Sequence, residues 1–196
     1  MKILEYITQK LIGKLINYDL ISEQELNIYR YGIHLLLSYS LNIFTILLIG
    51  ILENSLFETL CFTAIFIFIR SYSGGLHFSK FIYCYIGTIV VINLFIQLYK
   101  LSIPIPILNT IFFLIAFILF VTNPIDNKNR KFDSIEKKIF SKKAKRNIIL
   151  LSIFYFLCLH QTFFQVTYII FWASLFNLIN ILLAKSISKN NVKIFL

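Results

Sequence analysis

Long apolar stretches constrain this chain more than any other feature of its sequence. Most of them approach the roughly 20 residues that a helix needs to cross about 30 Å of hydrocarbon. With 58% hydrophobic and 14% charged residues, a water-soluble fold of 196 residues has too little interior to bury this surface. We therefore predict a single all-α domain over residues 1–196, a polytopic integral membrane protein with about six transmembrane helices. The six stretches are 32–52, 55–69, 81–99, 103–122, 148–163 and 166–184.

The last two stretches form a nearly continuous apolar run of 37 residues. A single helix of that length would extend about 55 Å, far more than one bilayer crossing requires. A hairpin that turns near residues 160–165 is therefore the simpler prediction.

The lysines and arginines lie mainly in segments that six spans would place on one side of the membrane. Eighteen of the 19 do so, and only Lys100 falls on the opposite side. Because positive charge is retained in the cytoplasm, we predict that both termini are cytoplasmic, including the tail over 185–196. Membrane topology thus accounts for the formal charge of +10, and we expect no nucleic-acid partner.

Residues 1–21 show the spacing of an amphipathic helix, which we predict to lie on the inner membrane surface. Ser22 and Glu25 have the S-x-x-E spacing of a capping box, which predicts the start of a helix leading into the first span. The transmembrane region is accordingly assigned to 22–184. The apolar positions of the first helix are Ile3, Leu4, Ile7, Leu11, Leu15 and Ile16.

The segment 123–147 is the only long polar stretch, and we predict a cytoplasmic loop there. It holds nine basic and three acidic residues, a net charge of +6. Such a run is often only a solvated topology signal. The functional alternative is that it attracts anionic lipid headgroups or an acidic substrate.

The stretch IRSYSGGLHFSKFIYCYIG, residues 69–87, gathers chemically active groups at the end of an apolar run. The second span has only about 15 apolar residues, so we expect the following loop, 70–84, to dip into the cytoplasmic half of the bilayer. Gly74 and Gly75 supply the backbone freedom for a turn there. Ser79 would cap the third span, which places Cys84 within its first two turns.

A nucleophilic cysteine must be a thiolate, and nearby cations or a helix N-terminus favour that form. His77, Arg70 and Lys80 are positioned in the sequence to supply such cations around Cys84. Residues seven apart in a straight helix lie about 10.5 Å apart along the axis, too far for a direct contact. His77 must therefore lie outside the helix that carries Cys84. The alternative is that His77 and Cys84 are packing residues.

The remaining cysteines and histidines fit structural roles better than chemical ones. Cys61 lies in mid-span with no histidine near it in sequence, and Cys158 and His160 point to different faces of a helix. His34 begins the first span, where it can reach the interface. Three cysteines without metal-like spacing predict neither a disulfide framework nor a metal, and we expect no cofactor.

The stretch RSYSGGLHFSKFIYC resembles the signature of the AgrB family, the integral-membrane cysteine endopeptidases of Gram-positive peptide quorum sensing. Arg70, Gly75, His77 and Cys84 match the family pattern in order and spacing. The resemblance covers the whole chain, because a length near 200 residues, a surface-lying N-terminal helix, about six spans and a basic central loop are shared.

The resemblance implies that Cys84 is the nucleophile and His77 the general acid/base, with Gly75 shaping the turn. Arg70 and Lys80 would support the site or bind substrate. The substrate would be a short, membrane-bound propeptide of the AgrD type, cleaved near its C-terminus to a thioester and cyclised to a thiolactone or lactone. The family further implies a homodimer in contact with membrane lipid, in the cell membrane of a Gram-positive bacterium, with a cytoplasmic active site.

Two other classes stay open at this point. A transporter or exporter of a small peptide or solute would line its path with polar intramembrane groups, of which Glu58 is the clearest here. A rhomboid-type serine protease using SYSGG would need a histidine from another span, and His160 is predicted at the far membrane face.

Overall fold

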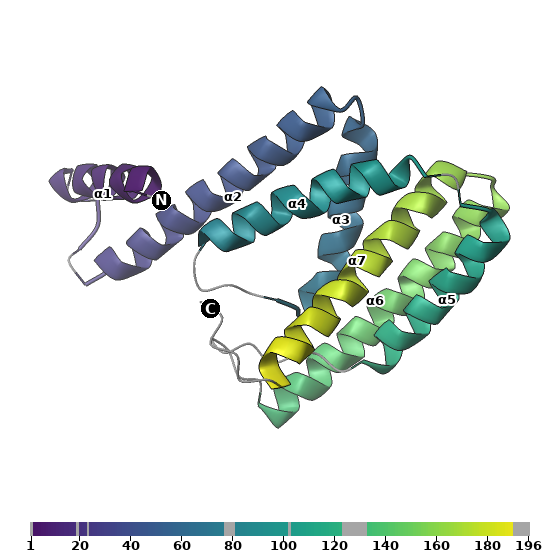
Figure 1. The fold of residues 1–196 in the computed structure, drawn as a ribbon. Helices are drawn as coiled ribbons and strands as arrows, with labels where there is room; N and C mark the ends of the chain where they lie inside the picture. The colour runs from purple at the N-terminus through teal and green to yellow at the C-terminus, as the bar shows by residue number, and fades with distance from the viewer. Residues whose placement is uncertain are drawn as a thin grey trace.

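The computed structural model describes residues 2–18, 20–22, 24–76, 81–101, 103–122 and 133–189. Within these ranges the chain forms seven α-helices and no strand, which confirms the predicted all-α fold (Figure 1). The helices are α1 (Lys2–Asn17), α2 (Leu26–Leu52), α3 (Leu56–Ser73), α4 (Phe81–Tyr99), α5 (Ile105–Val121), α6 (Ser134–His160) and α7 (Phe164–Lys189).

Four of the described helices are long and apolar enough to cross a membrane: α2, α3, α4 and α7. Helix α5 is apolar but has only 17 residues. Helix α6 has 27 residues, but its first half carries the lysines and only its second half is apolar. The six predicted stretches thus correspond to helices α2 to α7, and the number of crossings stays a prediction.

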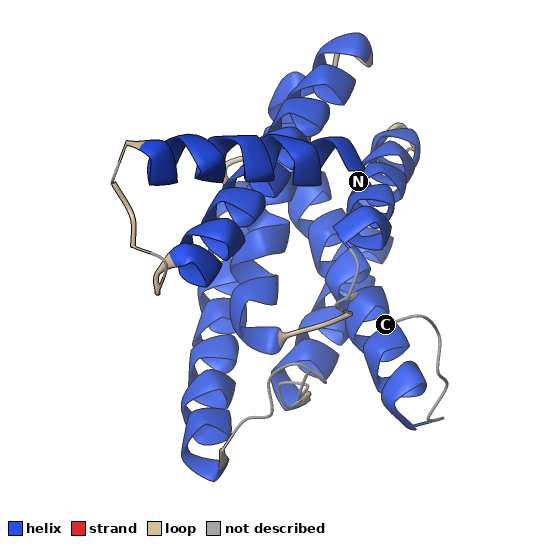
Figure 2. Ribbon diagram, turned by 90° about the vertical axis from the view of Figure 1, so that its left-hand side faces the viewer, coloured by secondary structure: helices blue, strands red, loops and turns tan. Residues whose placement is uncertain are grey.

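Helices α3 and α7 pack against each other at the centre of the molecule. Helices α5 and α6 lie on one side of this pair and α2 and α4 on the other, while α1 lies across the N-terminal part of α2 (Figures 1 and 2). The predicted N-terminal helix is therefore present, and its placement on a membrane surface stays a prediction.

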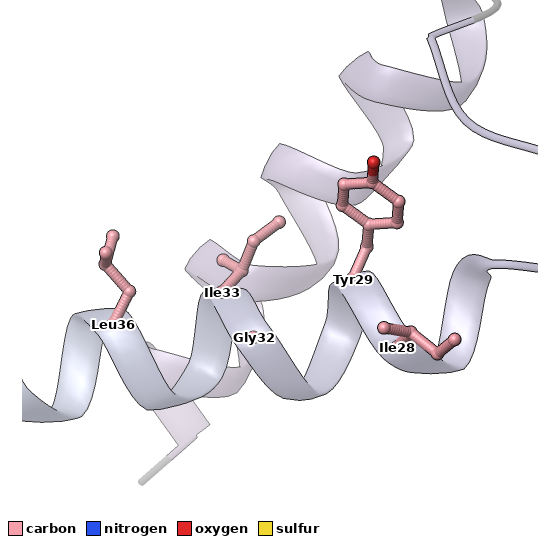
Figure 3. A pocket seen from close by; sticks show the side chains of 5 residues that line it. All are labelled: Ile28, Tyr29, Gly32, Ile33 and Leu36. Carbon is pink, nitrogen blue, oxygen red and sulfur yellow. The ribbon is translucent and has the colours of Figure 1, made fainter.

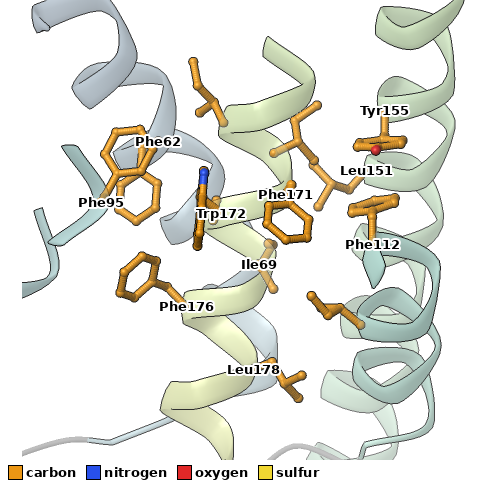
Figure 4. Packing of buried hydrophobic residues seen from close by; sticks show 14 of the residues in the cluster. Phe62, Ile69, Phe95, Phe112, Leu151, Tyr155, Phe171, Trp172, Phe176 and Leu178 are labelled. Atoms are coloured by element: carbon orange, nitrogen blue, oxygen red, sulfur yellow. The ribbon is translucent and has the colours of Figure 1, made fainter. Parts of the chain in front are cut away.

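Stacked aromatic rings join the helices in the core (Figure 4). Phe62 of α3 stacks on Phe95 of α4 with 4.0 Å between the ring centroids, and Phe176 of α7 meets Phe62 edge-on. On the other side, Phe112 of α5 stacks on Tyr155 of α6 at 3.7 Å. Between apolar helices in a bilayer such close packing, rather than removal from water, supplies the stabilisation.

Two tight turns close the α2–α3 and α6–α7 pairs. The Ser55 N–H donates to Gly50 O and the Asn54 N–H to Ile51 O, which is the Schellman pattern with Asn54 at positive φ. The same pattern ends α6, where Thr162 has φ 60°. The second turn confirms the predicted hairpin near residues 160–165.

Three segments predicted outside the spans are helical over part of their length. Helix α3 continues through Arg70 to Ser73 and α4 begins at Phe81, so both ends of the predicted loop 70–84 are helical, and the described residues 74–76 are not. Helix α6 occupies the second half of 123–147, because the Asp133 N–H donates to Glu136 and closes a capping box ahead of lysines that favour helix. Helix α7 extends into the predicted tail, as far as Lys189.

Ser22 and Glu25 form a turn directly before α2 and do not belong to the helix itself. Both the backbone N–H and the hydroxyl of Ser22 donate to the Glu25 carboxylate, and α2 begins at Leu26. The backbone hydrogen bond, followed by that from the hydroxyl, lowers the pKa of Glu25. The turn is therefore strongest above the ordinary pKa of a glutamate and weakens as the pH falls.

The absence of a side chain at Gly50 allows α2 and α3 to approach closely. A Cβ at this position would lie 3.2 Å from the Leu56 Cα, so Gly50→Val adds two further methyl groups where the helices already touch. We expect a loss of about 1–3 kcal/mol, the usual cost of overpacking, measured as a lower thermal midpoint in detergent.

Gly32→Val in the same helix is the matched control, since nothing lies within 4 Å of a Cβ there. Equal midpoints for the two valine variants would contradict the close α2–α3 packing.

Candidate active site

The non-helical residues after α3 are held by an arginine from the last turn of that helix. The Arg70 Nη2 donates to the carbonyl oxygen of Leu76 at 2.5 Å. Gly74 with φ 76° and Gly75 with φ 146° reverse the chain between the two residues, a conformation that favours glycine. The turn predicted from the glycine pair is therefore present.

A second side chain holds the same residue from another helix. The Leu76 N–H donates to the Asn180 Oδ1 of α7 at 2.8 Å. The two backbone polar groups of Leu76 thus bond to side chains of α3 and α7. In or near a bilayer, non-helical backbone is tolerated only where its polar groups are satisfied in this way.

Gly75 is required at this point by space as well as by backbone conformation. A Cβ on Gly75 would lie 2.1 Å from the Asn180 Oδ1, closer than any side chain tolerates, and 3.7 Å from the Arg70 Nε. The backbone at Gly75 therefore sits directly against the asparagine amide. This contact gives the predicted turn residue a physical reason to be glycine.

Cys84 lies in the first turn of α4, in agreement with the prediction that it falls within the first two turns of the third span. Its side chain is partly buried and lies within electrostatic range of the Arg70 guanidinium. Helix α4 is fixed there by the Tyr85 hydroxyl, which lies 2.9 Å from the Thr45 Oγ1 of α2. The structure therefore brings together Arg70, Gly75 and Cys84.

His77 and Lys80, the other two predicted site residues, lie outside the described residues, as does Ser79. The described chain ends one residue before His77 and resumes one residue after Lys80. Their positions relative to Cys84 stay predictions.

The other candidate groups lie away from this end of the molecule. Glu58 is in the first turn of α3 and Arg70 in its last, about 18 Å apart along the axis. His160 ends α6 about 20 Å along the helix axis from Asn147, which bonds to Phe68 near the end of α3 that carries Ser71 and Ser73. A serine–histidine pair from SYSGG and His160 therefore does not form.

The remaining two cysteines have structural surroundings. Cys158 is buried in the hydrophobic core, and Cys61 packs against that core from α3. Among the described residues no group of three histidine, cysteine or acidic side chains gathers as a metal site would.

Sequence reasoning missed three asparagines that tie the helices together near the site. The Asn147 Nδ2 of α6 donates to Phe68 O at 2.9 Å, and the Asn177 Nδ2 of α7 donates to Phe66 O at 3.3 Å, both carbonyls of α3. Asn180 lies one turn beyond Asn177. For the two in α7, the available signal was two amides three residues apart on one face of the apolar segment FNLINILL.

The basic half of α6 lies at the same end of the molecule. Tyr72 of α3 follows Arg70 by two residues, and the Lys143 Nζ of α6 lies 5.2 Å from the centre of its ring. The Tyr72 ring also meets Phe140 of α6 edge-on. At the opposite ends of α2 and α4, Lys100 pairs with Glu53 at 3.3 Å. Positive charge is therefore concentrated on the side of Cys84.

An apolar groove on α2 is separate from this site. Its lining residues are Ile28, Tyr29, Gly32, Ile33 and Leu36, and the Tyr29 hydroxyl is the one polar side-chain group among them (Figure 3). It contains none of the side chains that a hydrolytic reaction requires.

Comparison with known families agrees with the residues gathered here. The family model described as "AgrB: Accessory gene regulator B" matches residues 5–183. The chain belongs to the AgrB family. This family acts in the processing of the propeptide of peptide quorum sensing, so a propeptide is the substrate partner that the family provides.

Two relatives come from Clostridium perfringens. "Putative AgrB-like protein" of strain SM101 (Type A) is 30% identical over 157 residues, which are 76% of this chain and 71% of the relative. "Putative AgrB-like protein 2" of strain 13 (Type A) is 28% identical over 158 residues, with the same shares covered. No solved structure matches this chain significantly.

Gly75→Ala is expected to reduce propeptide processing at least about 100-fold. A displacement of catalytic groups by about 1 Å costs that much activity. In this variant the added methyl group would collide with the Asn180 amide, and alanine would be strained at the φ of 146°. The measurement is processed peptide formed per amount of folded protein in membranes.

Gly87→Ala, one turn after Cys84, is the control because nothing lies within 4 Å of its Cβ. Wild-type processing by the Gly75 variant would show that the close approach to Asn180 has no functional consequence.

Proposed function

We propose that this protein is a membrane-embedded cysteine endopeptidase that cleaves a short signalling propeptide near its C-terminus and assists its cyclisation. The observation that supports this proposal most directly is the placement of Cys84 in the first turn of α4, within electrostatic reach of Arg70. A cation and a helix N-terminus both favour the thiolate, which is the nucleophilic form of cysteine.

In the proposed reaction the Cys84 Sγ attacks the carbonyl carbon of the scissile peptide bond. His77 takes the thiol proton and delivers it to the leaving amine as the C–N bond breaks. The acyl group is then held on Cys84 as a thioester. A cysteine or serine side chain of the peptide attacks that thioester and closes a thiolactone or lactone ring, while its proton restores the Cys84 thiol.

The ring closes only if the internal nucleophile reaches the thioester before water does. A site at the membrane edge favours that outcome because surrounding helices and lipid limit access of water. We propose that the site and both termini face the cytoplasm, in keeping with the basic residues at this end.

The basic half of α6 supports an acidic C-terminal part of the propeptide as the leaving segment. Lys143, beside Tyr72 on the last turn of α3, lies on the α6 face that adjoins the site. Positive charge at this place would attract both an acidic peptide and anionic lipid headgroups. A homodimer remains part of the proposal from the family alone.

Cys84→Ala is expected to abolish processing of a co-expressed AgrD-type propeptide while leaving the amount of folded protein unchanged. Cys61→Ala and Cys158→Ala are matched controls, because these thiols lie in or against the hydrophobic core. A transporter would depend equally little on all three cysteines. Full processing by the Cys84 variant would therefore exclude the proposed enzyme and favour transport.

Alkylation of Cys84 by iodoacetamide provides a second test that needs no substrate. In a chain with Cys61→Ala and Cys158→Ala, we expect Cys84 to react below neutral pH, at least about tenfold faster than a free thiol under the same conditions. His77→Ala should slow this reaction. An unchanged rate in the His77 variant would remove histidine from the mechanism.

A further inference from the structure

We infer that Asn180 of α7 is a positioning residue for the chemistry of Cys84. Its side-chain oxygen holds the backbone N–H of Leu76, whose carbonyl oxygen in turn holds Arg70. Leu76 is also the residue that directly precedes His77 in the chain. The inference rests on the proposed function, since Asn180 has this role only if Cys84 is the nucleophile.

The first observation is that Leu76 is held from two helices at once. Asn180 accepts from the Leu76 N–H at 2.8 Å, and Arg70 donates to the Leu76 carbonyl oxygen at 2.5 Å. That carbonyl belongs to the peptide bond that joins Leu76 to His77. Arg70 therefore has its place beside Cys84 defined partly by a residue that Asn180 anchors.

The second observation is the close approach of Asn180 to Gly75. The Asn180 Oδ1 occupies the space where any other residue at position 75 would carry its Cβ. The backbone of two successive residues, Gly75 and Leu76, thus lies against the Asn180 side-chain amide. An incidental surface hydrogen bond would not exclude a side chain in this way.

The third observation separates Asn180 from its neighbour one turn earlier. Asn177 donates to Phe66 O of α3 and to Ala173 O of α7, so it joins two helices to each other. Asn180 instead accepts from a residue beyond the end of α3. The two asparagines therefore share a helix face but serve different parts of the structure.

Helix α7 is a suitable reference for this purpose because it packs against α3, α4, α5 and α6. Groups held on a rigid element keep a catalytic geometry more accurately than groups held within a loop alone. Without Asn180, the Leu76 N–H has no bond to α7. Among the described residues, Arg70 would then be bonded to backbone that is held through α3 and no longer through α7.

The test compares Asn180→Ala with Asn177→Ala in the full-length protein in membranes, with Cys61→Ala and Cys158→Ala present in both. The probe is iodoacetamide, and the measurement is the alkylation rate of Cys84 across a pH series. We expect Asn180→Ala to slow alkylation below neutral pH about tenfold or more, because a displaced Arg70 favours the Cys84 thiolate less. Asn177→Ala should change the profile less than about threefold per folded protein.

A double variant shows whether Asn180 acts through the site. Asn180→Ala should have little further effect in a chain that already carries His77→Ala, because coupled residues are not additive. If the Asn180→Ala protein fails to accumulate, Asn180→Ser takes its place. Serine keeps a polar group on α7 but ends short of the Leu76 N–H, so the same loss is expected.

Three outcomes would overturn the inference: a wild-type pH profile in the Asn180 variant, an equal change in the Asn177 variant, or full additivity with His77→Ala. Failure of the proposed function is distinguishable from these. In that case Cys84 would react like a free thiol in the chain that retains His77 and Asn180. The propeptide would still be processed by the Cys84→Ala variant.

Discussion

The two hydrogen bonds to Leu76 are the interaction on which the arrangement at this end of the molecule depends. Backbone that leaves a helix at the edge of a bilayer carries polar groups that lipid does not satisfy. Here Arg70 and Asn180 satisfy both groups of the same residue. The chain can therefore turn sharply after α3 with both backbone groups of Leu76 paired, and Cys84 lies in the first turn of the next helix.

This arrangement explains why polar side chains occur within such an apolar protein. Asn147 and Asn177 bond to carbonyl groups of α3, and Asn180 bonds to Leu76 beyond its end. The aromatic stacks of Phe62 and Phe112 fill the spaces between the helices. The amides set the position of α3 along its neighbours, while the Phe62 stack sets its distance from α4 and the Phe112 stack joins α5 to α6. Both are needed to place Arg70 relative to Cys84.

Much of the helical fold was predictable from the sequence, because long apolar runs and the charged segments between them have a direct physical meaning in a bilayer. The position of Cys84 near the start of α4 followed from the start of the apolar stretch 81–99 in the same way. The extension of α3 through Arg70 was not predictable from apolar length alone, since the last turn is polar and is completed by a bond to Leu76. The role of Asn180 was out of reach because 104 residues separate it from Leu76 in sequence and no local pattern links them.

The two Schellman turns restrict how the helices that they join can move. Each leaves three residues between its helices, from Leu52 to Leu56 and from His160 to Phe164. Three residues reach only a short distance even when extended, so movement of α3 relative to α2, or of α7 relative to α6, would pivot about these turns. Such movement would be largest at the far ends of the helices, where Arg70 and Asn180 both bond to Leu76. Those two bonds therefore lie where they limit the movement most effectively.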